Sequence, residues 1–156
     1  MSTYDAETMI NDIKSYLSSN LNTYITDMNT EKGDSLLSTI DSSAYSIVNL
    51  RESAMTFNPF VHIAIDDIEA ESIGPATHTL YKLIVAVCVT GLDESEDLWK
   101  VLLRYSEVLK RIFQEKWDAM TIMRLKVEEI PPAPFQLADQ AGIYHFTGIR
   151  VTAKWI

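Results

Sequence analysis

The stretch LYKLIVAVCVTGL, residues 80–92, is the most apolar run in the chain. It is only 13 residues long and contains Lys82 and Thr90, whereas a transmembrane helix needs about 20 largely apolar residues. Apolar residues alternate between its two sides, with Val85, Val87 and Val89 on one and Ile84, Ala86 and Cys88 on the other. Because both sides are apolar, we predict the central strand of a sheet that is covered on each face.

The composition is typical of a folded protein with one core. The chain has 156 residues, of which 47% are hydrophobic and 22% are charged. We therefore predict a single domain over residues 1–156. Residues 60–156 are expected to hold the sheet and a long helix, and residues 1–59 an N-terminal helix followed by a segment without a clear pattern.

The acidic charge lies in the first half of the chain. The net charge of −9 comes from 13 Lys and Arg against 22 Asp and Glu. Residues 1–78 hold 3 basic and 12 acidic residues, and residues 79–156 hold 10 of each. Such a chain lacks the positive surface that neutralises phosphates, which argues against a dedicated DNA- or RNA-binding module and against docking on anionic lipid.

Cys88 is the only cysteine, so an intramolecular disulfide and a cysteine zinc cluster are excluded. Its apolar neighbours predict a small buried hydrophobe rather than a reactive thiol. The first residues, MSTYDAETMINDIK, contain early acids and no continuous apolar stretch. A secretory signal peptide is therefore not expected, and we expect an intracellular protein or one released by lysis.

Two amphipathic helices are predicted from apolar residues at helical spacing. The first covers roughly residues 3–25 and is followed by a turn-rich connector around Gly33. The second carries an apolar stripe from Leu98 to Trp117, and the acidic cluster DESED, residues 93–97, is expected to cap its amino end.

Three large residues fall off the main stripes of these helices: Tyr16, Trp99 and Leu103. Extra apolar residues widen the buried face of a helix. We expect burial within the chain, and burial against another subunit is the alternative.

The remaining elements are strands and two long connections. A short helix or irregular strand is expected near residues 44–50, and period-two patterns predict strands from Phe60 over about seven residues, at 123–128 and at 144–156. The order of elements predicts an α+β fold, with a four- to five-stranded mixed or antiparallel sheet packed with the two helices.

The two connections, residues 66–79 and 129–143, are longer than a compact domain requires, so we predict that they contact neighbouring subunits. In the second, three prolines are expected to prevent regular strand pairing and to present Phe135 on an extended loop. The candidate interface residues are Asp66, Asp67, Glu69, Glu71, Pro131, Pro132, Pro134 and Phe135.

No catalytic or phosphate-binding motif occurs in the sequence, and no cofactor and no enzymatic activity are predicted. One alternative is a small metal-dependent enzyme, because imidazole and carboxylate groups of His62, Asp66, Asp67 and His78 could converge on a metal ion. Solvent-facing polar residues on a half-exposed strand are the interpretation that we favour for this group.

The order and character of the elements resemble those of the neck proteins of tailed bacteriophages. The similarity rests on a leading amphipathic helix, the strands FVHIAID and HTLYKLIVAVCVTG, the helix SEDLWKVLLRYSEVLKRIFQ and the closing strand FTGIRVTAKWI. These segments look most like those of tail terminator, or tail completion, proteins. The resemblance covers residues 60–156 better than residues 1–59.

This resemblance implies a structural virion protein, located in the tail neck and assembled in the cytoplasm of the bacterial host. It implies a homo-oligomeric ring of six subunits that caps the tail tube and contacts the head connector, and also the sheath protein if the tail is contractile. DNA would be passing cargo, and an acidic lumen would repel its phosphates. Another neck or tail-assembly protein, such as a head-closure ring or an assembly chaperone, is the alternative.

Overall fold

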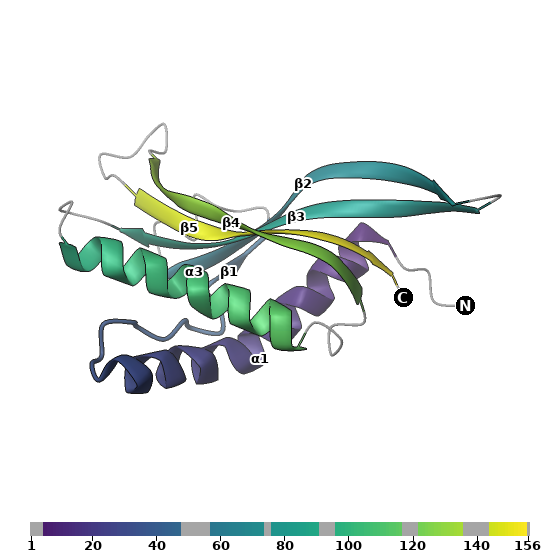
Figure 1. The fold of residues 1–156 in the computed structure, drawn as a ribbon. Helices are drawn as coiled ribbons and strands as arrows, with labels where there is room; N and C mark the ends of the chain where they lie inside the picture. Colours follow the sequence, from purple (N-terminus) through teal and green to yellow (C-terminus); the bar gives the residue numbers. More distant parts are fainter. Residues whose placement is uncertain are drawn as a thin grey trace.

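We describe the fold from a computed structural model, in residues 5–47, 57–73, 76–90, 96–116, 122–135 and 144–155. Five strands form one mixed sheet in the order β1-β2-β3-β5-β4. Two helices pack on it, and both lie on the same face of the sheet (Figure 1). The predicted α+β class with a five-stranded sheet is confirmed. The elements are α1 (Ala6–Lys32), β1 (Tyr45–Ser46), β2 (Phe60–Ile73), β3 (Ala76–Thr90), α3 (Glu96–Lys116), β4 (Ile122–Phe135) and β5 (Tyr144–Trp155).

Strand β3 is the centre of the sheet, as its apolar pattern predicts. It pairs antiparallel with β2 on one side and with β5 on the other. Val85 and Val87 are fully buried on the face that carries the helices. On the opposite face Cys88 lies in register between Phe60 and Phe146, and it is only 3% exposed. Both described helices lie on the face of Val85 and Val87, and a covering layer on the other face stays a prediction.

Helix α1 is longer than predicted. Asp5 caps its start by accepting a hydrogen bond from the Thr8 N–H at 2.8 Å. The helix passes residue 25 and ends at Lys32, because Met28 continues the buried stripe and is 1% exposed. Gly33 then adopts a left-handed conformation with φ of 72°, which terminates the helix. The predicted connector therefore begins about seven residues later than its sequence suggests.

The segment after α1 is held by two asparagine side chains of that helix. Asn22 accepts from the Ile40 N–H at 2.7 Å and donates to the Ile40 carbonyl at 2.9 Å. Asn29 makes the same pair of bonds with Leu37, at 3.1 and 2.9 Å. The amide side chains thus satisfy backbone groups as a neighbouring strand would. They lead the chain to the two-residue strand β1, which pairs parallel with β2.

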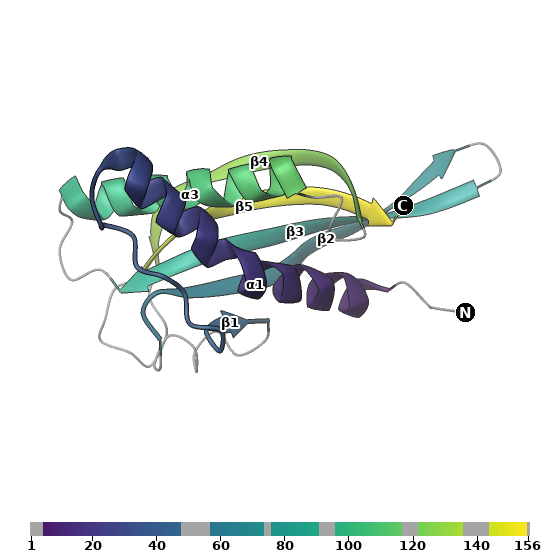
Figure 2. The ribbon, with the colours of Figure 1, turned by 90° about the horizontal axis from the view of Figure 1, so that it is seen from below.

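The connection predicted at residues 66–79 is not a loop in its described part. β2 continues to Ile73, and it pairs with β3 down to Ile73 opposite Ala76. The register shifts between Ile65 and Asp67, which indicates a β-bulge. Beyond it the two strands form a ribbon that projects past the other strands (Figures 1 and 2). We call residues 66–73 and 76–81 the arm.

The proline segment is also a strand in its described part, which corrects the predicted loop for residues 129–135. β4 is an edge strand that pairs with β5 alone among the described strands. Its register shifts between Ile130 and Ala133, so Pro131 and Pro132 lie at an irregularity in the ladder. Proline is tolerated at such positions because an edge strand has one side on which no N–H donor is needed. Residues 136–143 of the predicted loop and residues 93–95 of the predicted helix cap lie outside the described part.

We predict that Asn22→Ala will lower the free energy of unfolding by about 1–3 kcal/mol, because it leaves two backbone groups of Ile40 without their partner. Urea denaturation followed by circular dichroism measures this change. The matched control is Asn11→Ala, at an exposed position of the same helix, which should change stability by less than about 0.5 kcal/mol. Equal effects at both positions would show that the two hydrogen bonds between Asn22 and Ile40 contribute nothing to stability.

Candidate functional site

The described structure contains three surfaces that could take part in binding: the arm, a hollow on the face of the sheet opposite the helices, and a groove between the helices. The arm holds the first group of predicted interface residues, Asp66, Asp67, Glu69 and Glu71. Proline strand β4 holds the second group and borders the hollow.

At the base of the arm, two acids form ion pairs with neighbouring strands. Asp66 lies 3.0 Å from the guanidinium of Arg150, and Glu69 lies 2.9 Å from the ammonium of Lys82. The Glu69 hydrogen bond raises the pKa of Lys82, which keeps this lysine charged. Glu71 belongs to the arm through its backbone, which pairs with His78. The side chains of these last two residues lie outside the described part.

The arm also exposes an apolar side chain. Ile68 is 54% exposed, although its register partner Tyr81 is buried at the edge of the core. Asp67 and Glu69 flank it along β2, so an apolar residue is bordered by acids at the start of the arm. Sequence reasoning selected these acids but missed Ile68, because a single apolar residue within DDIEAES resembles a loop position.

Phe135 is not presented on an extended loop. Its ring stacks on Tyr144 with centroids 5.3 Å apart and meets Phe146 edge-on at 5.8 Å. Such ring pairs stabilise a fold by more than the burial of their apolar area alone would give. Phe135 therefore serves the internal packing of the β4–β5 pair. Its contact with a neighbouring subunit stays a prediction, as do those of Pro131, Pro132 and Pro134.

The hollow on the face of the sheet opposite the described helices has a volume of about 270 Å³. Burial raises the pKa of the Cys88 thiol to about 12, so this group stays protonated at neutral pH. Burial also lowers the pKa of His62, whose Nδ1 lies 3.2 Å from the Ser46 hydroxyl. The hollow is thus an apolar surface without an ionised group among its lining residues, which are His62, Ile84, Ala86, Cys88, Phe135 and Phe146.

The groove between α1 and α3 has a volume of about 390 Å³ and a different character. Four of the 13 Lys and Arg residues line it, in a chain whose net charge is −9. Its apolar part includes Leu103, which is 56% exposed. We call this the α1–α3 groove, lined by Met28, Lys32, Lys100, Leu103, Arg104, Glu107 and Arg111.

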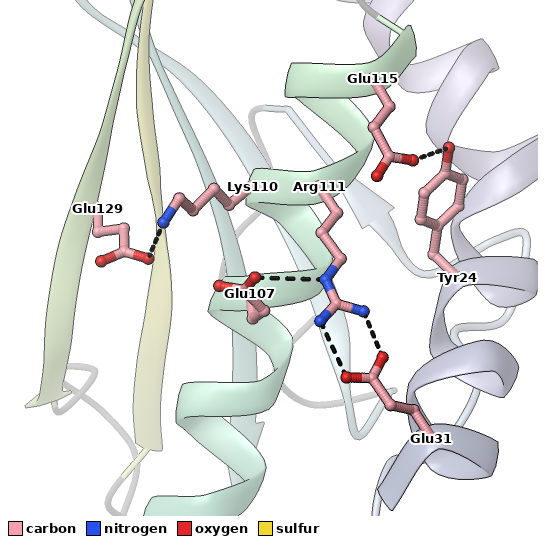
Figure 3. Close-up of polar contacts among 7 residues, drawn as sticks. All are labelled: Tyr24, Glu31, Glu107, Lys110, Arg111, Glu115 and Glu129. Carbon is pink, nitrogen blue, oxygen red and sulfur yellow. Dashed lines mark hydrogen bonds and ion pairs between the residues drawn. The ribbon is translucent and has the colours of Figure 1, made fainter.

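Ion pairs fix the two arginines of the groove. Arg104 donates to both carboxylate oxygens of Asp34, at 2.9 and 2.7 Å. Arg111 contacts Glu31 at 2.7 Å and Glu107 at 3.3 Å, and Figure 3 shows its guanidinium between these two acids. Hydrogen bonds from the arginines lower the pKa of Glu31 and of Asp34. The groove thus has a defined basic rim.

Two residues predicted to be buried within the chain are exposed. Trp99 is 50% exposed and Leu103 is 56% exposed, one helical turn apart on α3. The physical reason is that α3 buries its main stripe between the sheet and α1, and these two positions lie beside that stripe. Tyr16, by contrast, is partly buried against the core, as expected.

Of the residues proposed for a metal site, His62 and Asp66 have other partners in the described structure, and the side chain of His78 lies outside the described part. Asp66 pairs with Arg150, whereas His62 contacts Ser46. Among the side chains that the structure describes, no group of three or more His, Cys, Asp and Glu is placed to hold a metal ion. No described helix is long and apolar enough to cross a membrane.

Comparison with known proteins gives no assignment, because no protein-family model and no curated protein matches the chain.

We predict that Cys88 will not react with a thiol reagent in the folded protein at pH 8, because the thiol is buried and its pKa is raised to about 12. Reaction with an aromatic disulfide, followed by absorbance, should require unfolding in urea. Fast modification of the native protein would contradict the burial of Cys88.

We predict that the protein loses stability as the pH falls from about 5 to 3, partly through Glu31 and Asp34. Their pKa values are lowered in the folded state, so their contribution is present above the unfolded pKa near 4 and is lost as the pH falls through the folded values. Urea midpoints at several pH values measure this.

The double variant Glu31→Gln/Asp34→Asn should show a shallower decline over the same pH range. Asp27→Asn, which removes an exposed carboxylate from α1, is the control and should keep the slope of the wild-type protein. If stability declined with pH at the same slope in all three proteins, the ion pairs of Glu31 and Asp34 would not be a cause of the pH dependence.

Proposed function

We propose that the protein is a structural virion protein, a tail terminator subunit that forms a six-membered ring at the neck of a tailed bacteriophage. The ring caps the tail tube and joins it to the head connector. This proposal rests on the resemblance in the sequence and on the arm. The described elements also follow the order on which the resemblance is based.

The arm is the observation that carries the proposal. Beyond Tyr81, the described strands pair β3 with β2 alone, and no described strand pairs with the outer side of β2 beyond His62. An isolated two-stranded ribbon is marginally stable in water, and its open edges and exposed apolar residues gain partners on assembly. A projecting ribbon is therefore expected in a subunit that reaches a neighbour.

The charge distribution is compatible with a channel for DNA. The acidic half of the chain supplies the arm and α1, and an acidic wall repels phosphates and lets a duplex slide. A location of Asp66, Asp67, Glu69 and Glu71 on the outer rim of the ring would remove this part of the proposal. The ring itself would not be affected.

We predict that native mass spectrometry of the purified protein will give a closed oligomer with about six times the 17.7 kDa mass of one chain. Electron microscopy of particles should place the protein at the junction between tail tube and head. A monomer at all concentrations would contradict the ring. Density at another neck position would favour a head-closure protein, and absence from particles would favour an assembly chaperone.

A further inference from the structure

Three large apolar side chains are exposed among the described residues, and they lie in two places. Ile68 is on the arm, and Trp99 and Leu103 are on the first half of α3. Large exposed apolar residues that are bordered by charge are typical of interfaces, where an apolar centre is surrounded by a polar rim. Each of these two surfaces therefore has the character of one side of an interface.

The two places lie at opposite ends of the molecule. The arm projects from one end of the sheet, whereas the first half of α3 and the last turns of α1 lie at the other end (Figures 1 and 2). An arm therefore cannot reach the α1–α3 groove of its own chain. A contact between these surfaces joins two copies head to tail, and a head-to-tail contact repeated around an axis closes a ring.

The charges of the two surfaces are opposite. Residues 66–82 contain four acids and one lysine, which gives −4 + 1 = −3, and the guanidinium of Arg150, which pairs with Asp66, changes this to −2. The α1–α3 groove is lined by four basic residues and one acid, and the carboxylates of Glu31 and Asp34 reduce its charge from +3 to +1. The groove is thus positive although the net charge of the chain is −9. It attracts the acidic arm of another copy, and this attraction orients the two copies as they associate.

We propose that the arm of one copy binds the α1–α3 groove of the next copy, with Ile68 against Leu103 and Trp99. Asp67 and Glu69 then face the basic rim of the groove, which includes Lys100 and Arg104. This inference rests on the ring proposed above and names the two surfaces that build it. The occupant of the groove is thus a second copy of this chain.

Two substitutions test the contact from its two sides. Ile68→Ser removes the apolar centre from the arm, and Leu103→Glu places a negative charge in the groove opposite the acidic arm. Each should weaken self-association roughly 100-fold, the size expected at the centre of an interface, and should give a monomer by native mass spectrometry. Both positions are more than half exposed, so circular dichroism should show the wild-type fold.

A mixture of the two variants gives the sharper result. The Leu103→Glu chain keeps an intact arm and the Ile68→Ser chain keeps an intact groove, so one contact forms between them and a second cannot. The mixture should therefore contain mixed dimers that grow no further. The control Ser19→Glu, on the exposed side of α1 opposite Met28, adds the same charge and should still form the ring.

The outcomes separate the two proposals. If the wild-type protein forms a ring and both variants form it equally well, the arm–groove contact is wrong and the ring stands. If the variants are monomers but make no mixed dimer, the two surfaces bind different partners and the contact is again wrong. A monomeric wild-type protein would overturn the ring and, with it, this inference.

Discussion

The backbone ladder of β3 is the constraint on which the rest of the structure depends. This strand pairs with β2 and β5 along most of its length, and its valines on the helix side are fully buried. Because β3 is fixed on both edges, the neighbouring strands inherit its register, and their apolar residues form the surface on which α3 and α1 pack. Gly148 of β5 allows this pairing to be close, since a side-chain carbon there would collide with the Val85 carbonyl.

The packing of the helices on the sheet positions the α1–α3 groove and the arm at opposite ends of the molecule. α3 packs its main stripe on the sheet, which leaves Trp99 and Leu103 outside the core. The ion pairs of Arg111 with Glu31 of α1 and of Arg104 with Asp34, just after α1, then fix the walls of the groove. At the other end, the bulge after Ile65 marks the point where β2 leaves the core and the arm begins. One rigid layer thus separates a basic groove from an acidic ribbon.

Much of the fold could be predicted from the sequence where burial leaves a periodic pattern. Val85 and Val87 identify the central strand, and the stripe of α3 identifies its helix. The arm could not be predicted, because a ribbon exposed on both faces has no apolar alternation, and acids with a glycine and a proline nearby resemble a loop. The prolines of β4 led to the prediction of a loop for a related reason. Prolines are excluded from interior strands, but they are tolerated in an edge strand. The groove depends on residues of two helices that are distant in sequence, such as Lys32 and Arg104, and no local pattern joins them.

The length of β3 has a mechanical consequence. Its 15 residues span about 50 Å at roughly 3.4 Å per residue, from the arm to the strand end that precedes α3. A tensile load applied to the arm therefore runs along the strand axis, and the hydrogen bonds to β2 and β5 lie across this direction. They share the load in shear and do not open one after another. A protein held at both ends of this strand would resist the load with all of these hydrogen bonds together.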